Sequence, residues 1–102
     1  MIHVIAEIET TEGRREAFLE EFNRVVPLVL DEDGCLEYGA TIDAPTGIER
    51  QAPLRTNAVT IIEKWSNIDA LQDHLDSEHM AAYRERVVDH VAGATLRILE
   101  PA

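Results

Sequence analysis

The sequence predicts an α+β fold of the split βαβ type, with the element order β-α-β-β-α-β and a four-stranded antiparallel sheet that carries its helices on one face. Four short segments show the alternation of strands, and two longer regions show the three- and four-residue spacing of helices. The 102 residues suit one core, and no repeat or low-complexity linker divides them. Residues 1–102 are therefore expected to form a single domain.

The first strand is expected over Ile2–Glu9, where apolar and polar side chains alternate. A long helix should follow Thr10–Gly13, because apolar residues recur every three or four positions as far as Val29. Pro27 lies inside this run, and since proline removes a backbone amide it should kink or split the helix. The acidic turn Asp31–Gly34 then ends the helix.

The second strand is expected over Cys35–Ile42, with Leu36, Tyr38, Ala40 and Ile42 on one side. Residues 43–57 contain two prolines, a glycine and several charges, which indicates a long loop or an extended hairpin. Loops of this length within a compact domain are usually functional or mobile. The third strand should cover Ala58–Trp65.

Two short helices are expected before the last strand. Ser66–Asp69 has the spacing of a capping box that opens the first of them, and Asp76-Ser77 marks a break. The second helix is expected to run through Val91, because the apolar spacing continues that far, until Gly93 stops it. The last strand should then cover Ala94–Leu99.

Both faces of the predicted sheet carry apolar residues. Neighbouring positions in a strand point to opposite faces, and both positions are apolar in Val4-Ile5, Ile61-Ile62 and Ile98-Leu99. The helices can cover one face, and no further segment is available to cover the other. A homodimer joined sheet to sheet is therefore expected.

The charge balance excludes several kinds of partner. Nine Lys and Arg against 20 Asp and Glu give a formal net charge of −11, so a basic face for nucleic acid or an anionic membrane surface is not expected. No apolar run approaches the about 20 residues of a membrane span, and the first residues do not resemble a signal peptide, so a cytoplasmic location is expected. The acidity could keep a dimer soluble or reflect a salt-adapted source.

Glu63 and Trp65 are two residues apart in the third strand and should share a face. If that face meets the helices, Glu63 is a partly desolvated acid with a raised pKa, able to exchange protons near neutral pH. The alternative is a salt bridge from Glu63 near the strand end. Trp65 is more often a core residue than a catalytic one.

The histidines give no metal signature. His74 and His79 are five residues apart, which on an unbroken helix separates their side chains by roughly 140°. Cys35 is the only cysteine, so a disulfide framework, a thiolate cluster and a metal site are not expected. His3 and His90 are expected at the surface. The residues alone thus predict a small acidic domain, dimeric, whose apolar pocket holds an acid and an imidazole.

Three segments, Gly34–Tyr38, Glu63–Ser66 and Ala70–His79, together resemble the antibiotic biosynthesis monooxygenase family. The resemblance covers nearly the whole chain except residues 43–57, where this sequence has a longer loop than many relatives. It implies a ferredoxin-like fold that dimerises through its sheets into an α/β barrel, with a pocket between sheet and helices. Family enzymes oxygenate phenolic substrates with O₂ and without metal, flavin or haem, so no cofactor is expected.

The resemblance also implies roles for individual residues. His74 is expected to act as a base or as the hydrogen-bond partner of the substrate hydroxyl, and Glu63 as a second acid or base. Trp65 is expected to form a wall of the pocket. Further substrate-binding residues are expected at Tyr38, His79 and Tyr83.

The expected function is oxidation of a small quinol-like or polycyclic phenolic substrate by O₂. A non-catalytic dimeric module that binds small ligands or acts in stress remains an alternative, as does an isomerase of a small hydroxyketone. The haem-degrading branch of the same superfamily is disfavoured, because its first-strand Asn and its axial His correspond here to Ile8 and Arg84.

Overall fold

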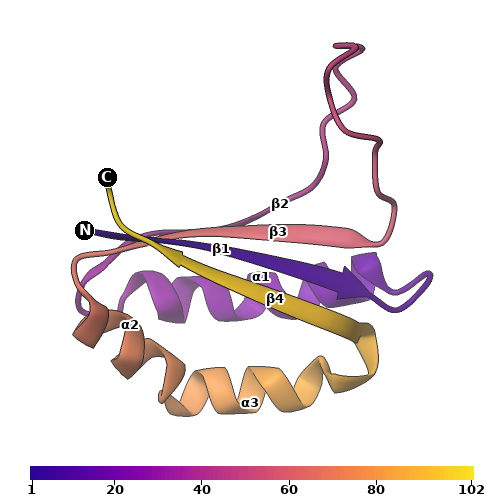
Figure 1. Ribbon diagram of the computed structural model, residues 1–102. Coiled ribbons are helices and arrows are strands. Elements are labelled where there is room, and N and C mark those ends of the chain that lie inside the picture. The colour runs from indigo at the N-terminus through magenta and orange to yellow at the C-terminus, as the bar shows by residue number, and fades with distance from the viewer.

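The computed structural model, which describes residues 1–102, contains a four-stranded antiparallel sheet of order β2-β3-β1-β4 with the helices on one face (Figure 1). The predicted ferredoxin-like α+β fold is confirmed. In chain order the elements are β1 (Ile2–Thr10), α1 (Arg15–Leu30), β2 (Cys35–Thr41), β3 (Ala58–Trp65), α2 (Ile68–Leu75), α3 (Glu78–Arg86), a 3₁₀ turn (Val88–His90) and β4 (Val91–Leu99).

The hydrophobic core lies between the sheet and the helices. α1 contributes Phe18 and Phe22, which are fully buried and have ring centroids 6.1 Å apart. Val4 of β1 pairs with Glu63 of β3 and with Ile98 of β4, and residues paired across antiparallel strands share a face. Glu63 therefore points to the helix-covered side of the sheet, which is the condition under which a raised pKa is expected for it.

The other face of the sheet is uncovered in the single chain. Ile5, Ile62 and Leu99 lie on this open face, and Ile62 is 38% exposed. Apolar residues on both faces are thus confirmed. The sheet has two free edges, β2 and β4, so the single chain forms an open sheet and not the closed barrel that the family resemblance implies for a dimer.

The predicted end of the last helix is wrong. α3 ends at Arg86 and does not reach Val91, and Val88–His90 form a 3₁₀ turn before it. Val91 instead begins β4 and pairs with Thr10 of β1. Strand pairing at this position therefore outweighs the helical spacing of the valines, and Val88 is left exposed to solvent.

Pro27 does not split α1, which is continuous from Arg15 to Leu30. A proline inside a helix removes one backbone hydrogen bond. Here Phe22, Val25 and Val29 lie on both sides of Pro27 and are all buried, so packing against the sheet holds the helix together.

Two local predictions also differ. Leu36 is exposed, because the pairing of β2 with β3 shifts by one residue between Cys35 and Glu37, while Ile42 lies beyond the end of β2. α2 is capped by Asn67, whose Oδ1 accepts a hydrogen bond from the backbone N–H of Ala70 at 2.8 Å, and not by Ser66.

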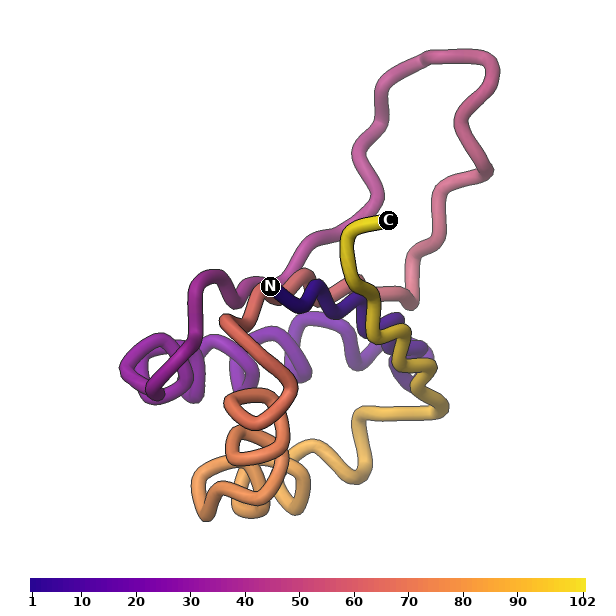
Figure 2. Tube along the Cα trace, turned by 60° about the vertical axis from the view of Figure 1, so that its left-hand side comes forward, coloured from indigo at the N-terminus to yellow at the C-terminus, as the bar shows by residue number.

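Residues 42–57 form an arm that stands away from the body on the side of the sheet opposite the helices (Figures 1 and 2). The long loop expected here is confirmed. At its base, Arg55 Nη2 lies 2.9 Å from Asp43 Oδ1 and Arg55 Nε lies 2.9 Å from Asp43 Oδ2. These bonds to Arg55 lower the pKa of the Asp43 carboxyl to about 2.

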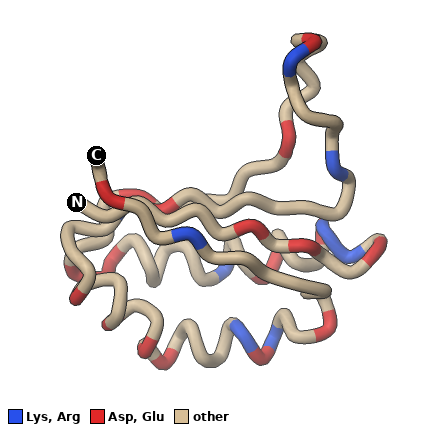
Figure 3. The backbone as a smooth tube through the Cα atoms, in the orientation of Figure 1, with Lys and Arg blue, Asp and Glu red and all other residues tan.

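Carboxylates are spread over the helices, the strands and the arm, and the few Lys and Arg form no dense patch (Figure 3). No helix combines the length and apolarity needed to cross a membrane. The cytoplasmic location stays a prediction.

Gly34, in the turn between α1 and β2, is the position least tolerant of a side chain. Its φ is +82°, and an added Cβ would lie 2.6 Å from Ala70 Cβ and from Ser66 Oγ. Strain and overpacking together predict that Gly34→Ala lowers the free energy of unfolding by about 2–5 kcal/mol in urea unfolding.

Gly13→Ala is the matched control, because Gly13 has a φ of +77° and no atom within 4 Å of an added Cβ. It should cost about 1–2 kcal/mol. Equal losses in the two variants would contradict the close approach at Gly34.

Candidate functional site

A cavity of about 270 Å³ lies between the covered face of the sheet and the helices. Most of its lining is apolar and comes from all three helices and the sheet. Its polar lining residues are Tyr38, Glu63, His74, Tyr83 and Arg84. Leu96 of β4 also lines the cavity and is 49% exposed, so the cavity is not sealed on the β4 side.

Glu63 presents a buried carboxyl to this cavity. Its exposed fraction is 5%, and its Oε1 accepts a hydrogen bond from Trp65 Nε1–H at 2.9 Å. Burial raises the pKa of Glu63 to about 7; the Trp65 hydrogen bond opposes this rise, and the charge of Glu32 adds to it. Glu63 forms no ion pair, so the salt bridge considered as an alternative is absent.

His74 presents a buried imidazole from α2. It is 1% exposed, and its ring centroid lies 4.6 Å from that of Trp65 and 5.3 Å from that of Tyr38. Desolvation lowers the pKa of His74, while the hydrogen bond to Glu32 acts in the opposite direction. The imidazole is therefore held mainly neutral at pH 7.

The two nitrogens of the His74 ring have different surroundings. Nδ1 lies 2.9 Å from Glu32 Oε2. Nε2 has no hydrogen-bond partner in the chain. Since every fully buried polar side-chain atom has a partner, Nε2 is not completely enclosed, and His74 is one of the residues that line the cavity.

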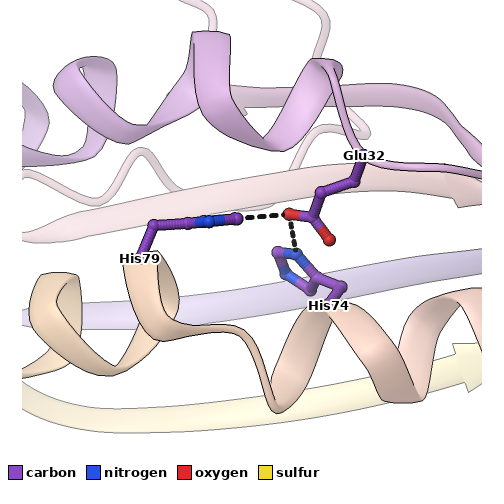
Figure 4. A group of neighbouring side chains, drawn as sticks. All are labelled: Glu32, His74 and His79. Carbon is purple, nitrogen blue, oxygen red and sulfur yellow. Dashed lines mark hydrogen bonds and ion pairs between the residues drawn. The ribbon is translucent and has the colours of Figure 1, made fainter.

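Glu32 lies between two histidines from different helices (Figure 4). His79 Nε2 is 2.7 Å from the same Oε2 that contacts His74. The expectation that the two imidazoles diverge is wrong, because it assumed an unbroken helix, whereas α2 ends at Leu75 and α3 begins at Glu78. The three side chains bring one ligand atom each within 4.8 Å of one another, so two imidazoles and a carboxylate could hold a divalent cation here.

The structure brings most of the predicted site residues to one cavity. Tyr38, Glu63, His74 and Tyr83 line it. Trp65 does not: it is fully buried and contacts Glu63 and His74 from behind. His79 does not line the cavity either, because it points to Glu32.

Sequence reasoning missed Glu32 and the place of Arg84 in the site. Glu32 is 42 residues from His74, and it stands in an acidic turn where nothing distinguishes it from its neighbours. Arg84 lines the cavity and donates from Nη2 to the backbone oxygen of Leu75 at 2.6 Å, which ties α3 to the end of α2.

A second cavity of about 700 Å³ lies at the base of the arm. Glu7, Glu9 and Arg55 are its charged lining residues, and Arg55 is already paired with Asp43 and Glu7. It contains no imidazole and no buried acid. The smaller cavity is therefore the candidate functional site.

Comparison with known proteins gives a consistent set of relatives. Residues 1–86 match the model of a family described as antibiotic biosynthesis monooxygenase. The chain is 40% identical to the Escherichia coli (strain K12) protein named "Probable quinol monooxygenase YgiN", over 99% of this chain and 98% of that protein.

Two solved structures share the fold. PA3566 from Pseudomonas aeruginosa has a TM-score of 0.82 at 23% identity. The match covers 99% of this chain and 93% of the PA3566 chain. A conserved protein from Methanosarcina mazei Go1 has a TM-score of 0.84 at 18% identity, with coverage of 99% and 92%.

The buried carboxyl of Glu63 should make stability depend on pH. Because its pKa is about 7 in the folded chain, above the ordinary value of 4.5, the folded state holds the proton that the unfolded state releases between these values. The free energy of unfolding therefore falls as pH rises through this window, by about 3 kcal/mol at most.

Glu63→Gln keeps the shape and the acceptor for Trp65 and removes the titration. Urea unfolding from pH 4.5 to 8 should show the wild-type protein losing stability relative to Glu63→Gln as pH rises. A difference between the two proteins that stays constant over this range would contradict the raised pKa.

Proposed function

Because the chain belongs to the antibiotic biosynthesis monooxygenase family, we propose that it uses O₂ to oxidise a small quinol-like or polycyclic phenolic substrate, without a cofactor, in the cavity of Glu63 and His74. Family membership and the 40% identical relative support a monooxygenase, and the name of that relative supports a quinol as substrate. The observation that carries the proposal is the pairing of a buried acid and a buried neutral imidazole at one apolar cavity.

A quinol can supply every electron that this reaction needs. One hydroquinone and one O₂ give one hydroxyquinone and one water, and the four electrons that reduce O₂ come from the two hydroxyl groups and one ring C–H. Deprotonation of a hydroxyl makes the ring a stronger electron donor. The protein then has to bind and orient the substrate, exclude water and move protons.

His74 is the proposed base. Its Nε2 takes the proton of a substrate hydroxyl, and the phenolate transfers an electron to O₂, after which the two radicals combine into a carbon–oxygen bond. Glu63, with a pKa of about 7, protonates the resulting peroxide and then takes the ring C–H proton as the O–O bond breaks. The leaving hydroxide takes the proton from His74 and departs as water.

The remaining residues of the site bind the substrate or hold the catalytic groups in place. Burial raises the pKa of Tyr38 and of Tyr83, so both phenols stay neutral and can donate hydrogen bonds to substrate oxygens. Trp65 acts from behind the cavity wall by fixing the carboxyl of Glu63. Phe18 and Met80 are among the apolar side chains that line the cavity and would contact the substrate ring.

An oxygen electrode tests the proposed reaction with a panel of hydroquinones. The wild-type protein should consume O₂ with at least one of them, and His74→Ala should lower kcat by about 100- to 10,000-fold because the base is lost. His90→Ala is the control and should retain full activity, since His90 lies outside the cavity and contacts Arg14.

No O₂ consumption with any substrate, or equal rates for wild type and His74→Ala, would overturn the proposal. Turnover of a hydroxyketone without O₂ would identify an isomerase. Binding of a hydroquinone without any turnover would identify a ligand-binding module.

We also infer that the protein forms a homodimer through the open face of the sheet. Ile5, Ile62 and Leu99 supply an apolar surface there that no segment of the chain covers. Two copies related by a two-fold axis could pair these faces and close their sheets into an α/β barrel. The arm, which stands on the same side as the open face, would then lie beside the second copy.

Ile62→Asp tests the dimer, because it places two charges close together at a two-fold interface. Analytical ultracentrifugation at micromolar concentration should give a dimer for the wild type and a monomer for Ile62→Asp. Val88→Asp is the control, since Val88 is 67% exposed and lies outside the sheet, and it should remain dimeric. A monomeric wild type would contradict the inference.

A further inference from the structure

We propose that Glu32 and His79 form an orienting pair for His74: Glu32 is a positioning residue that keeps the His74 Nδ1 protonated and its Nε2 free, and His79 holds Glu32 in place. The catalytic consequence rests on the function proposed above. The arrangement of the three side chains is independent of that function (Figure 4).

The contact with Glu32 determines the tautomer of His74. A carboxylate accepts hydrogen bonds and does not donate them, so the His74 Nδ1 must be the donor to Glu32 Oε2. A neutral imidazole carries one N–H. The His74 Nε2 therefore carries the lone pair, and it is the nitrogen left without a partner in a residue that lines the cavity.

The negative charge of Glu32 also affects how readily His74 takes up a proton. When Nε2 takes a proton from the substrate, His74 becomes an imidazolium inside a region that disfavours charge. The Glu32 carboxylate is 2.9 Å away and stabilises that cation, in the way that a buried carboxylate supports the histidine of a catalytic triad. Without it, proton uptake by His74 would be less favourable.

Glu32 is partly buried and is held in place by His79. The side chains of His79, Glu32 and His74 are 26%, 14% and 1% exposed, so Glu32 lies one layer below the surface. His79 donates to the same Oε2 that accepts from His74. This second bond restrains the carboxyl group that accepts from His74.

The backbone around both partners is also fixed. The Glu32 N–H donates to Val29 O and its carbonyl accepts from the Cys35 N–H, while Gly34 O accepts from the Ser66 N–H at 2.8 Å. Ser77 Oγ donates to His74 O at 2.8 Å at the break between α2 and α3. Rigid support of this kind is what a positioning group needs.

Nitrogen-15 NMR of the histidine rings tests the tautomer without any need for turnover. At pH 8, wild-type His74 should show a protonated Nδ1 and an unprotonated Nε2. Glu32→Gln should populate both tautomers of His74, because an amide can accept or donate. A wild-type His74 protonated at Nε2 would overturn the proposal.

Kinetics test the positioning role. Glu32→Gln should lower kcat by about 10- to 100-fold and leave KM within about twofold. Changes of this size are typical when a residue that holds a catalytic side chain in place is replaced. His79→Ala should lower kcat less, and His79→Gln should restore it, because its amide can still donate to Glu32. Glu37→Gln is the control, since Glu37 is exposed and pairs with Lys64.

Unchanged kcat and tautomer in Glu32→Gln would also overturn the proposal. If no substrate turns over but the NMR result holds, the proposed function fails and the orienting pair stands.

A third experiment adds Zn²⁺. Stoichiometric binding that is lost in His79→Ala would overturn the proposal, because a metal ion on Nδ1 of His74 forces the proton onto Nε2.

Discussion

The site depends on a carboxyl and an imidazole that are buried beside a largely apolar cavity. A polar group removed from water is costly unless it has a hydrogen-bond partner, and each group here has one. Trp65 donates to Glu63, and Glu32 accepts from His74. These two contacts require three parts of the fold to meet. β3 supplies Glu63 and Trp65, α2 supplies His74, and the turn after α1 supplies Glu32. The packing of Trp65 against the His74 ring joins both pairs into one unit.

The fold divides the two faces of the sheet between two tasks. The covered face holds the cavity, and incomplete cover over β4 leaves that cavity open on one side. The open face offers apolar surface and the base of the arm. Because neighbouring residues in a strand serve opposite faces, Ile61 lines the cavity while Ile62 is exposed on the other side. Substitutions on the open face can therefore leave the lining of the cavity unchanged.

Local patterns in the sequence predict most of this fold. Alternation identifies the strands, and the two-residue period alone brings Glu63 and Trp65 to one face. Prediction fails where distant contacts decide. Val91 follows the helical spacing of the valines but pairs with Thr10, and Pro27 lies within a helix that packing holds together. Sequence likewise could not select Glu32, because its contacts to His74 and His79 depend on how α1, α2 and α3 pack.

The proposed reaction requires His74 to take a proton from a phenol bound in the cavity. The most direct test is ultraviolet absorption of a quinol bound without O₂ at pH 7, in wild type and in His74→Ala. We expect a phenolate band for the wild type and only the neutral phenol for the variant. A quinol that binds to the wild type and stays neutral, or a phenolate band that survives His74→Ala, would contradict it.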